Sequence, residues 1–314
     1  LIHHVLTHAG LQGTQSPKSF NNHLGVPLTL LSAKPDHDFV ACEIGTNHPG
    51  EIDFLGAIAR PDIAVITSIG EEHLKFFGDI NGVAEEEFSI VRHLADEHTV
   101  VTGNLGSFSD RLAADPEVND IPAVSCGYTP PSDMPLVGEH NRINALMAWC
   151  IARWIGLVGE QCDKALRTVA PAKHRGEIIR LAQGVLIYDD CYNANPSSIR
   201  AAIDTLRAMP CDGKRVAVLG DMLELGEHSH ALHTDIGRYA MGDGDVYPFL
   251  IGEHFSKIGF DMFVRPPQLQ WSDELPDSVA QFIEPGDTVL LKASRGMRLE
   301  RLIPAIERRF GKAE

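Results

Sequence analysis

The sequence is short of positive charge. Its 314 residues contain 27 Lys and Arg against 43 Asp and Glu, so the formal net charge is -16. Surfaces that bind nucleic acid or anionic membranes are normally rich in Lys and Arg. This balance therefore argues against a nucleic-acid partner and against an anionic membrane surface.

Long apolar runs and paired cysteines are missing too. No apolar stretch approaches the ~20 residues that a membrane-spanning helix needs, so we expect no membrane insertion. The six cysteines form no C-x-x-C pair, which favours reduced thiols over a disulfide framework or a zinc site. With 44% hydrophobic and 22% charged residues, the composition is that of a globular protein long enough for two domains. We expect a cytoplasmic monomer.

One stretch of the sequence joins an apolar strand to the start of a helix. Residues 185–187 are apolar and predict a strand that ends near Asp190. Pro196 suits the first turn of a helix, with Asn195 as its N-cap. In open α/β sheets, ligands bind at the carboxyl ends of the strands. Adjacent acids, Asn193 and a tyrosine exceed what a cap requires, so a ligand site is favoured over an ordinary capped corner.

Strands and helices alternate through the second half of the chain, which predicts a Rossmann-like parallel-sheet domain over residues 177–314. The expected strands are 185–188, 215–219, 247–251 and 288–292, and the expected helices lie near 197–208, 229–241 and 297–309. The loops that follow residues 219 and 291 should reach the same sheet edge as Asp190. There Lys292, Ser294 and Arg295 can bind a carboxylate or a phosphate, although an exposed Lys-Arg pair is commonly only solvated.

The first half also predicts a parallel sheet, in a domain that spans residues 1–176 and ends in a linker. The expected elements are a buried helix ending near residue 31, strands at 39–45, 63–69 and 99–102, a loop at 115–137 and a helix that starts at 138. Asn141 and Asn144 share the first-turn face of that helix. They either cap it or present two amides to a base or a phosphate.

A carboxylate and an imidazole each follow an apolar strand of the first domain. Glu43 ends the strand at 39–45, and His73 lies just beyond the strand at 63–69. If these strands are parallel neighbours, both side chains lie at one edge of the sheet, within reach of a shared divalent cation. A lone histidine after a strand is usually just a surface residue, and the pairing with Glu43 is what favours a metal site.

Together, several motifs resemble the Mur ligase family, most closely the type that uses D-alanyl-D-alanine. The similarity runs from about residue 19 to about residue 302. The order and spacing of the motifs carry it, since each motif alone is weak. The motifs are Asn21-Asn22, 25–31, 43–52, 138–141, 189–196, 220–226 and 292–295.

The resemblance implies a cytoplasmic ligase of peptidoglycan precursor synthesis. Such enzymes use ATP and Mg2+ to convert the carboxylate of a UDP-N-acetylmuramoyl tripeptide into an acyl phosphate, which the amine of D-alanyl-D-alanine attacks. By this resemblance the metal ligands are Glu43, His73 and Glu87, and the nucleotide contacts are Asn141, Asn144, Arg175 and Asp190. The expected catalytic residues are His73, Lys292 and Arg295, and the expected substrate contacts are Asn193, Asn195 and Ser294.

Three departures from the family pattern stand out. No G-x-x-x-x-G-K-[ST] run occurs in the sequence; in the family it lies immediately upstream of the segment that Leu1 begins, after a further domain that grips the uridine nucleotide. Without that phosphate cradle we expect the 314-residue chain itself to be inactive. A β-rich stretch before residue 138 is replaced by a short loop. Glu87 occupies the place of a carbamylated lysine, where its carboxylate either imitates the carbamate or belongs to a solvated acidic face.

Two other functions remain open at this point. One is a Mur-like binding protein that keeps a ligand cleft without chemistry. The other is a ligase of the folylpolyglutamate synthase type, which also forms an amide through an acyl phosphate. The 189–196 stretch followed by Gly220–Gly226 favours the D-alanyl-D-alanine type.

Overall fold

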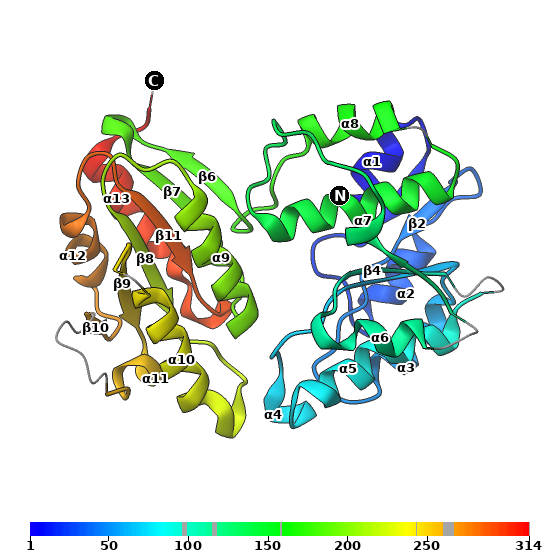
Figure 1. The fold of residues 1–314 in the computed structure, drawn as a ribbon, viewed down its shortest axis with the longest axis horizontal. Coiled ribbons are helices and arrows are strands. Elements are labelled where there is room, and N and C mark those ends of the chain that lie inside the picture. Colours follow the sequence, from blue (N-terminus) through cyan, green and yellow to red (C-terminus); the bar gives the residue numbers. More distant parts are fainter. Residues whose placement is uncertain (96–98, 115–117, 158, 243, 260–266, 314) are drawn as a thin grey trace. The chain divides into compact units, whose positions relative to one another are not determined.

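The computed structural model describes residues 1–95, 99–114, 118–157, 159–242, 244–259 and 267–313. The chain forms two compact units (Figure 1). The first comprises residues 1–135 and 140–170, and the second residues 136–139 and 171–314. Residues 171–176 therefore pack with the second unit. Within the described residues, none of the helices combines the length and apolar character that crossing a bilayer requires.

The second unit is built on a six-stranded sheet in the order β10-β9-β8-β11-β7-β6. Its strands are β6 (Glu177–Arg180), β7 (Leu186–Asp189), β8 (Arg215–Gly220), β9 (Val246–Ile251), β10 (Gln268–Leu269) and β11 (Thr288–Lys292). All of them pair in parallel except β6, which runs antiparallel to β7. The last strand, β11, returns between β7 and β8, and this places three strand ends that are distant in sequence side by side.

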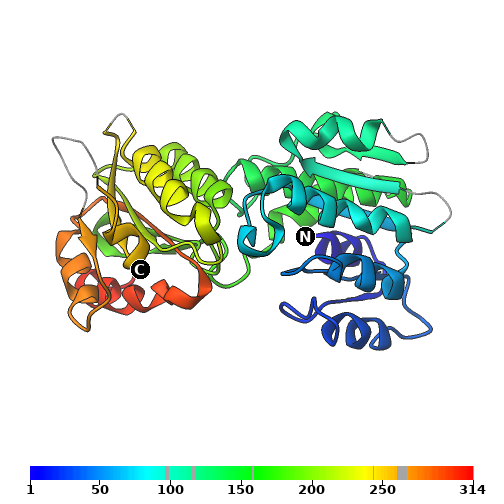
Figure 2. The same cartoon turned by 90° about the horizontal axis from the view of Figure 1, so that it is seen from below.

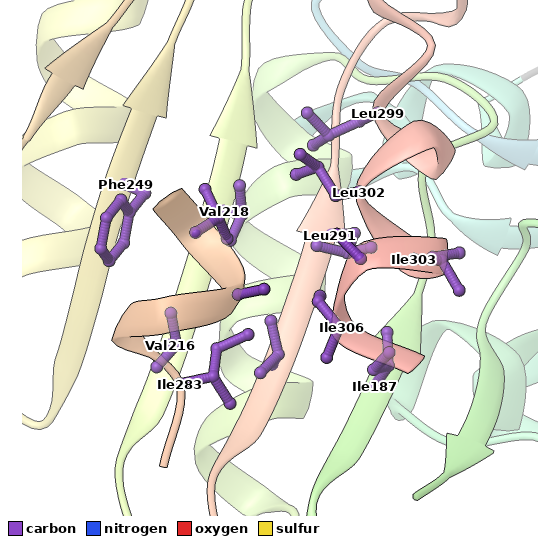
Figure 3. Close-up of a cluster of buried hydrophobic side chains, with 14 of the residues drawn as sticks. Ile187, Val216, Val218, Phe249, Ile283, Leu291, Leu299, Leu302, Ile303 and Ile306 are labelled. Atoms are coloured by element: carbon purple, nitrogen blue, oxygen red, sulfur yellow. The ribbon is translucent and has the colours of Figure 1, made fainter. Parts of the chain in front are cut away.

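Helices cover both faces of this sheet because its central strands are apolar on both sides. The helices are α9 (Pro196–Ala208), α10 (Ser229–Met241), α11 (Glu253–Ser256), α12 (Leu275–Phe282) and α13 (Ile303–Phe310), with 3-10 turns η4 (Ala182–Gly184), η5 (Gly226–His228), η6 (Arg295–Met297) and η7 (Leu299–Leu302). In Figure 2, α9 and α10 lie on one side of the sheet and α12 and α13 on the other. Figure 3 shows Val216, Val218 and Leu291 packed against Ile283 and Ile306.

The expected strands of this unit are confirmed to within a residue or two, but the expected helix at 297–309 is wrong in its first half. The segment begins as η6 and η7, and the α-helix starts only at Ile303. Pro304 lies in the first turn of α13. Because proline is tolerated in a first turn and breaks a helix interior, it sets the start of the helix.

The first unit contains a three-stranded parallel sheet and a separate two-stranded one. The strands are β1 (Gly13–Gln15) paired with β2 (Phe39–Ala41), and β3 (Ile63–Ser68), β4 (Thr99–Asn104) and β5 (Asn119–Pro122) in that order. Its helices are α1 (Ile2–His8), α2 (Gly25–Leu31), α3 (Glu51–Ala59), α4 (Leu74–Phe77), α5 (Ile80–Phe88), α6 (Ser109–Ala113), α7 (Glu139–Trp154) and α8 (Gly159–Thr168), with η1 (Ser89–His93), η2 (Gly106–Phe108) and η3 (Ala123–Ser125). The side chains of α7 pack on one face of β4, and those of α3 and η1 on the other.

Three sequence-based expectations for this unit are wrong. The stretch 115–137 is not only loop, because β5 pairs with the buried strand β4; such a long-range contact overrides local composition. The helix ending at residue 31 is not fully buried, since Leu28 and Leu31 are 55% and 81% exposed. Finally, β2 stops at Ala41, well short of the expected end at residue 45.

Candidate functional site

Three loops of the second unit meet at the carboxyl ends of β7, β8 and β11. The register pairs Leu291 with both Asp189 and Val218, so these strands end nearly level. The loops that follow therefore begin side by side, which confirms that the segments after residues 189, 220 and 292 share one sheet edge. Ligands of open α/β sheets bind at such an edge.

Lys292 joins the first of these loops to β11. Its ammonium is buried and lies 2.6 Å from Oδ2 of Asp190, and it also donates to the backbone oxygens of Asn193 (3.1 Å) and Asp190 (3.4 Å). A lysine has three N–H donors, and these three acceptors use them. In this structure Lys292 therefore holds the loop, and its predicted part in catalysis is not tested by these contacts.

Ser294 links two loops in a similar way. Its hydroxyl is buried, accepts a hydrogen bond from the N–H of Leu223 at 2.9 Å, and donates to the backbone oxygen of Ala194 at 3.3 Å. The loop after β8 and the loop after β7 are thereby tied to β11. The arrangement gives Ser294 a structural role beside its predicted contact with substrate.

The two asparagines of the first loop differ in their surroundings. Asn195 is the N-cap of α9: its Oδ1 accepts from the N–H of Ser198 at 2.7 Å, and the Ser198 hydroxyl accepts from the N–H of Asn195 at 3.0 Å. This is a complete capping box. Asn193 instead has an exposed side chain on a backbone that Lys292 fixes. Of the two, Asn193 is the better placed to meet a ligand.

Two arginines lie beside this loop. The guanidinium of Arg175 stacks 4.0 Å from the centre of the Tyr192 ring, a cation–π arrangement that orients an exposed side chain. Arg295 is exposed and pairs with Glu300, with 3.0 Å between Nη1 and Oε1. Both cations are available at the surface of the second unit.

A buried polar pair supports the loop after β8. The carboxylate of Asp221 accepts the N–H groups of His254 and Phe255 at the start of α11, at 2.9 and 3.0 Å. Nε2 of His233 accepts the N–H of Met222 at 3.0 Å, and its Nδ1 lies 2.7 Å from the oxygen of Ser229. These contacts fix the turn that starts the Gly220–Gly226 motif.

The expected strand pairing behind the Glu43–His73 metal site is wrong. In the described part of the chain, β2 pairs with β1, whereas β3 pairs with β4, so the two strands belong to different sheets. The N–H of Glu43 donates to the hydroxyl of Ser16 at 2.9 Å, where a longer β2 would have bonded a neighbouring strand. Whether the two side chains share a cation stays a prediction.

Glu43 and His73 lie in different local surroundings. The exposed carboxylate of Glu43 accepts a hydrogen bond from Asn21 at 2.9 Å. His73 is half-buried at the N-cap of α4, with a left-handed backbone at φ 51°. A non-glycine residue with such a φ is uncommon and often marks a functional position.

The three successive glutamates of α5 do not form one solvated face. Glu85 is exposed, whereas Glu86 is buried and accepts the N–H groups of Gly50 and Ile52 at 2.7 and 2.8 Å, capping α3. Glu87 is half-buried. Burial, followed by the charges of Glu72 and Glu86, raises the pKa of Glu87 to about 8.

The two helix-start asparagines of α7 are neighbours, as the helical spacing predicts. Nδ2 of Asn144 lies 3.5 Å from Oδ1 of Asn141, whose own Nδ2 lies 3.1 Å from the ring of His140. Both are half-buried. Elsewhere in this unit, a hollow of about 380 Å³ is lined by residues such as Asp53 and Arg92 and by none of the predicted site residues.

Comparison with known proteins decides the family. The Mur ligase middle domain matches residues 1–133, and the glutamate ligase domain of Mur ligases matches residues 174–295. The UDP-N-acetylmuramoyl-tripeptide–D-alanyl-D-alanine ligase of Escherichia coli is 31% identical over 92% of this chain and 70% of its own length. The chain belongs to the Mur ligase family. The ligase of the same name from Bacillus subtilis is 30% identical over 91% of the chain and 68% of its own length.

Solved Mur ligases share this fold. The MurF crystal structure from Acinetobacter baumannii superimposes with a TM-score of 0.83 at 27% identity, covering 98% of this chain and 73% of that one. The Thermotoga maritima MurF, solved in complex with ADP, gives a TM-score of 0.81 at 25% identity and covers 98% of this chain and 75% of that one. The expected α/β fold, a Mur ligase middle domain followed by a Rossmann-like domain, is therefore confirmed.

Some important residues of this Mur ligase were missed by sequence reasoning. The sequence pattern assigns no role to Glu86, and Asp221 belongs to the 220–226 motif without a role of its own. Neither role had a usable local signal, because Glu86 caps a helix 36 residues upstream and Asp221 one that starts 32 residues downstream. The role of a buried carboxylate becomes visible from the N–H groups that donate to it, and here those N–H groups belong to residues far away in the sequence.

We expect His233 to make this Mur ligase sensitive to acid. Burial, opposed in part by Ser229 and Asp221, lowers the pKa of His233, and a proton on Nε2 would face the N–H of Met222. In the unfolded chain the pKa of His233 is about 6.5. Below that pH the unfolded chain binds a proton at His233 that the folded chain does not bind. The unfolding free energy therefore falls as pH falls, by up to ~1.4 kcal/mol per pH unit.

The measurement is chemical denaturation between about pH 7 and pH 5, the window that this shift defines. His233→Gln should flatten the decline relative to the unchanged chain. The exposed His230 on the same helix gives the matched control, His230→Gln, which removes only the smallest of the influences on the pKa of His233 and should change the decline little. Equal pH slopes for the unchanged chain and His233→Gln would contradict the expectation.

Proposed function

We propose that this chain carries the nucleotide and acceptor sites of a ligase that joins D-alanyl-D-alanine to a UDP-N-acetylmuramoyl tripeptide with ATP and Mg2+, in the cytoplasm, as a monomer. The observation that carries the proposal is its 31% identity over 92% of its length to a ligase of that name. The proposed domain assignment goes with it: the central ATP-binding domain lies within residues 1–176, of which 136–139 and 171–176 pack with the second unit, and residues 177–314 form the acceptor domain.

On the nucleotide side, we assign Asn141 and Asn144 to the adenine and Arg175 and Asp190 to the rest of the nucleotide. Two linked amides offer donors and acceptors that match the edge of a base. Stacking on Tyr192 holds the guanidinium of Arg175 in one orientation. Its N–H groups can therefore donate two hydrogen bonds at once to phosphate or ribose oxygens.

We also propose a magnesium ion in the first unit. Glu87 has a pKa raised to about 8 by burial and by the neighbouring charges of Glu72 and Glu86, and a divalent cation would relieve that repulsion. We assign Glu43, His73 and Glu87 as the residues that would hold it. Bound there, Mg2+ would neutralise phosphate charge.

On the acceptor side, we assign Asn193 and Arg295 to the dipeptide and the acyl phosphate. Asn193 offers a donor and an acceptor on an exposed, backbone-fixed side chain. Arg295 is an exposed cation whose partner Glu300 lies in the same segment, so it can exchange that carboxylate for an anionic oxygen. Lys292 keeps its proposed catalytic role and Ser294 its proposed contact with substrate, and both also hold the loops that carry these groups.

The experiment restores the phosphate loop. We expect a chimera, in which the amino-terminal portion of the Escherichia coli relative, from the uridine-binding domain through the phosphate loop, precedes Leu1, to release phosphate from ATP only with both UDP-N-acetylmuramoyl tripeptide and D-alanyl-D-alanine. The 314-residue chain alone should release none, since no G-x-x-x-x-G-K-[ST] run is present to cradle the phosphates.

The acceptor decides between the proposal and its competitors. Phosphate release that requires a folate and L-glutamate would assign the chain to the folylpolyglutamate synthase type instead. A folded chimera that binds ADP but turns over neither acceptor would identify a binding protein. Turnover by the 314-residue chain itself would contradict the proposed need for the phosphate loop.

Asn193 and Asn195 should respond differently to substitution with alanine. Asn195→Ala removes the cap of α9 and should lower the unfolding free energy by about 0.5–2 kcal/mol. Asn193→Ala should leave stability unchanged and lower kcat/KM for the dipeptide about ten- to a hundredfold, the cost of losing a polar partner of about 1–3 kcal/mol.

Thermal melting and acceptor kinetics of the chimera separate the two roles. The nucleotide KM serves as the internal control, because Asn193 is assigned to the acceptor side and Asn195 to the cap of α9, so both variants should leave it unchanged. If Asn193→Ala keeps normal kinetics for D-alanyl-D-alanine, the acceptor site lies elsewhere.

A further inference from the structure

Three metal-binding types of side chain converge in the second unit, outside the groups assigned to the ligase reaction. His174 precedes β6, Asp189 ends β7, and Cys191 lies two residues further on. Each offers one ligand atom, and the three atoms all lie within 4.8 Å of one another. An imidazole, a carboxylate and a thiol together are a donor set typical of zinc and related ions.

Asp189 lies at the centre of this cluster. Its Oδ2 is 2.6 Å from Nδ1 of His174, and its Oδ1 accepts from Sγ of Cys191 at 2.8 Å. Asp189 and Cys191 are almost wholly buried, and the side chain of His174 is 15% exposed. The ligand atoms are thus shielded from water, with one partly open side through which an ion can enter.

Glu300 lies beside Cys191 at this cluster. Its Oε2 lies 3.9 Å from Sγ of Cys191, while its Oε1 pairs with Arg295. Two carboxylates therefore flank a thiol that is protonated in the absence of metal, because burial and the Asp189 charge raise the pKa of Cys191. A divalent cation would balance the negative charges of the Asp189 and Glu300 carboxylates.

The backbone of His174 is strained in a way that directs it to this cluster. Its φ is 62°, in the left-handed region that residues other than glycine rarely adopt. Such strain tends to persist where a side chain has a functional role. The same turn carries the imidazole to Asp189.

We propose that His174, Asp189 and Cys191, completed by Glu300, bind a transition-metal ion of the zinc type. Tetrahedral bonds of about 2.0–2.3 Å set the ligand atoms roughly 3.3–3.6 Å apart, so side-chain shifts of roughly 1 Å suffice. The thiol proton is released on binding, and the imidazole carries its remaining proton on Nε2. A thiolate ligand excludes Mg2+ as the natural occupant, which separates this site from the magnesium assigned to the first unit.

The test uses Co2+ as a spectroscopic substitute for Zn2+ on the 314-residue chain, after treatment with a chelator. We expect one Co2+ per chain with a thiolate-to-cobalt charge-transfer band, which Zn2+ abolishes by displacement. Cys191→Ser should remove the band, and His174→Asn, which tolerates the left-handed backbone, should weaken binding more than about tenfold. Cys211→Ser is the matched control, a cysteine of the same unit that contacts Gly286, and it should change nothing.

Three results would overturn the proposal: no band with the unchanged chain, a band that survives Cys191→Ser, or one that Cys211→Ser removes. Each would leave the cluster a hydrogen-bond network only. If Cys191→Ser melts too early to be measured, His174→Asn decides through its Co2+ affinity. The readout does not depend on turnover, so it stands apart from the proposed ligase function.

Discussion

Lys292→Met is expected to lower the unfolding free energy of the second unit by about 3–5 kcal/mol, the usual cost of removing one partner of a buried ion pair. The ammonium of Lys292 is buried 2.6 Å from Asp190 and also holds two backbone oxygens. Methionine fills a similar volume and leaves the carboxylate and both oxygens without their donor. The loop that carries Asn193 should then lose its fixed position.

Denaturation followed by the fluorescence of Trp271, with Trp149 and Trp154 of the first unit replaced by Phe, measures this effect in the second unit. Lys257→Met is the control, since Lys257 forms an exposed pair with Glu253 and should cost less than ~1 kcal/mol. A double variant with Asp190→Asn should recover part of the loss, because the unpaired charge is gone. A Lys292→Met variant as stable as the unchanged chain would show that the pair does not hold the loop.

Glu86→Ala is expected to destabilise the first unit by about 3–5 kcal/mol, since its buried donors lose a charged acceptor worth roughly 1.5–3 kcal/mol each. The carboxylate of Glu86 accepts the N–H groups of Gly50 and Ile52 and the hydroxyl of Thr46. Negative charge at this position also complements the amino end of α3. Alanine leaves the buried N–H of Ile52 and the partly buried N–H of Gly50 without this partner.

Amide hydrogen exchange gives the local readout. The N–H groups of Gly50 and Ile52 should exchange faster in Glu86→Ala, and the unit should unfold at lower denaturant concentration. Glu85→Ala is the matched control from the same helix, because Glu85 is exposed and lies 3.8 Å from Arg111 in a surface pair. Unchanged exchange of the two amides would mean that Glu86 does not cap α3.

Much of the candidate site followed from local pattern. The apolar runs before residues 189, 220 and 292 gave three parallel strands, and parallel strands end at a common edge, which β11 confirms by pairing with both β7 and β8. Pro196 and a preceding asparagine were enough to predict the cap of α9. These signals are short in range, so the sequence displays them directly.

Partner choice between distant residues was not visible in the same way. Glu43 and His73 were expected on neighbouring strands, yet β2 and β3 belong to different sheets. Lys292 was expected to bind a carboxylate or a phosphate, and the structure shows which carboxylate it meets: its donors contact Asp190 of its own chain and two backbone oxygens. In both cases the local pattern was compatible with more than one partner.

The sequence by itself determined the alternation of strands and helices, the loops that end at one sheet edge, and the order of motifs that is typical of Mur ligases. Only the tertiary structure decided which charged side chains pair with other groups of the same chain. It also decided that Glu86 caps a helix while the pKa of Glu87 is raised. The meeting of His174, Asp189 and Cys191 is likewise a result of the tertiary structure. Periodicity and capping act within a few residues of the chain. Pairing and burial depend on strand order and packing, which bring together residues far apart in sequence, and there the same side chain has a different energy in each environment.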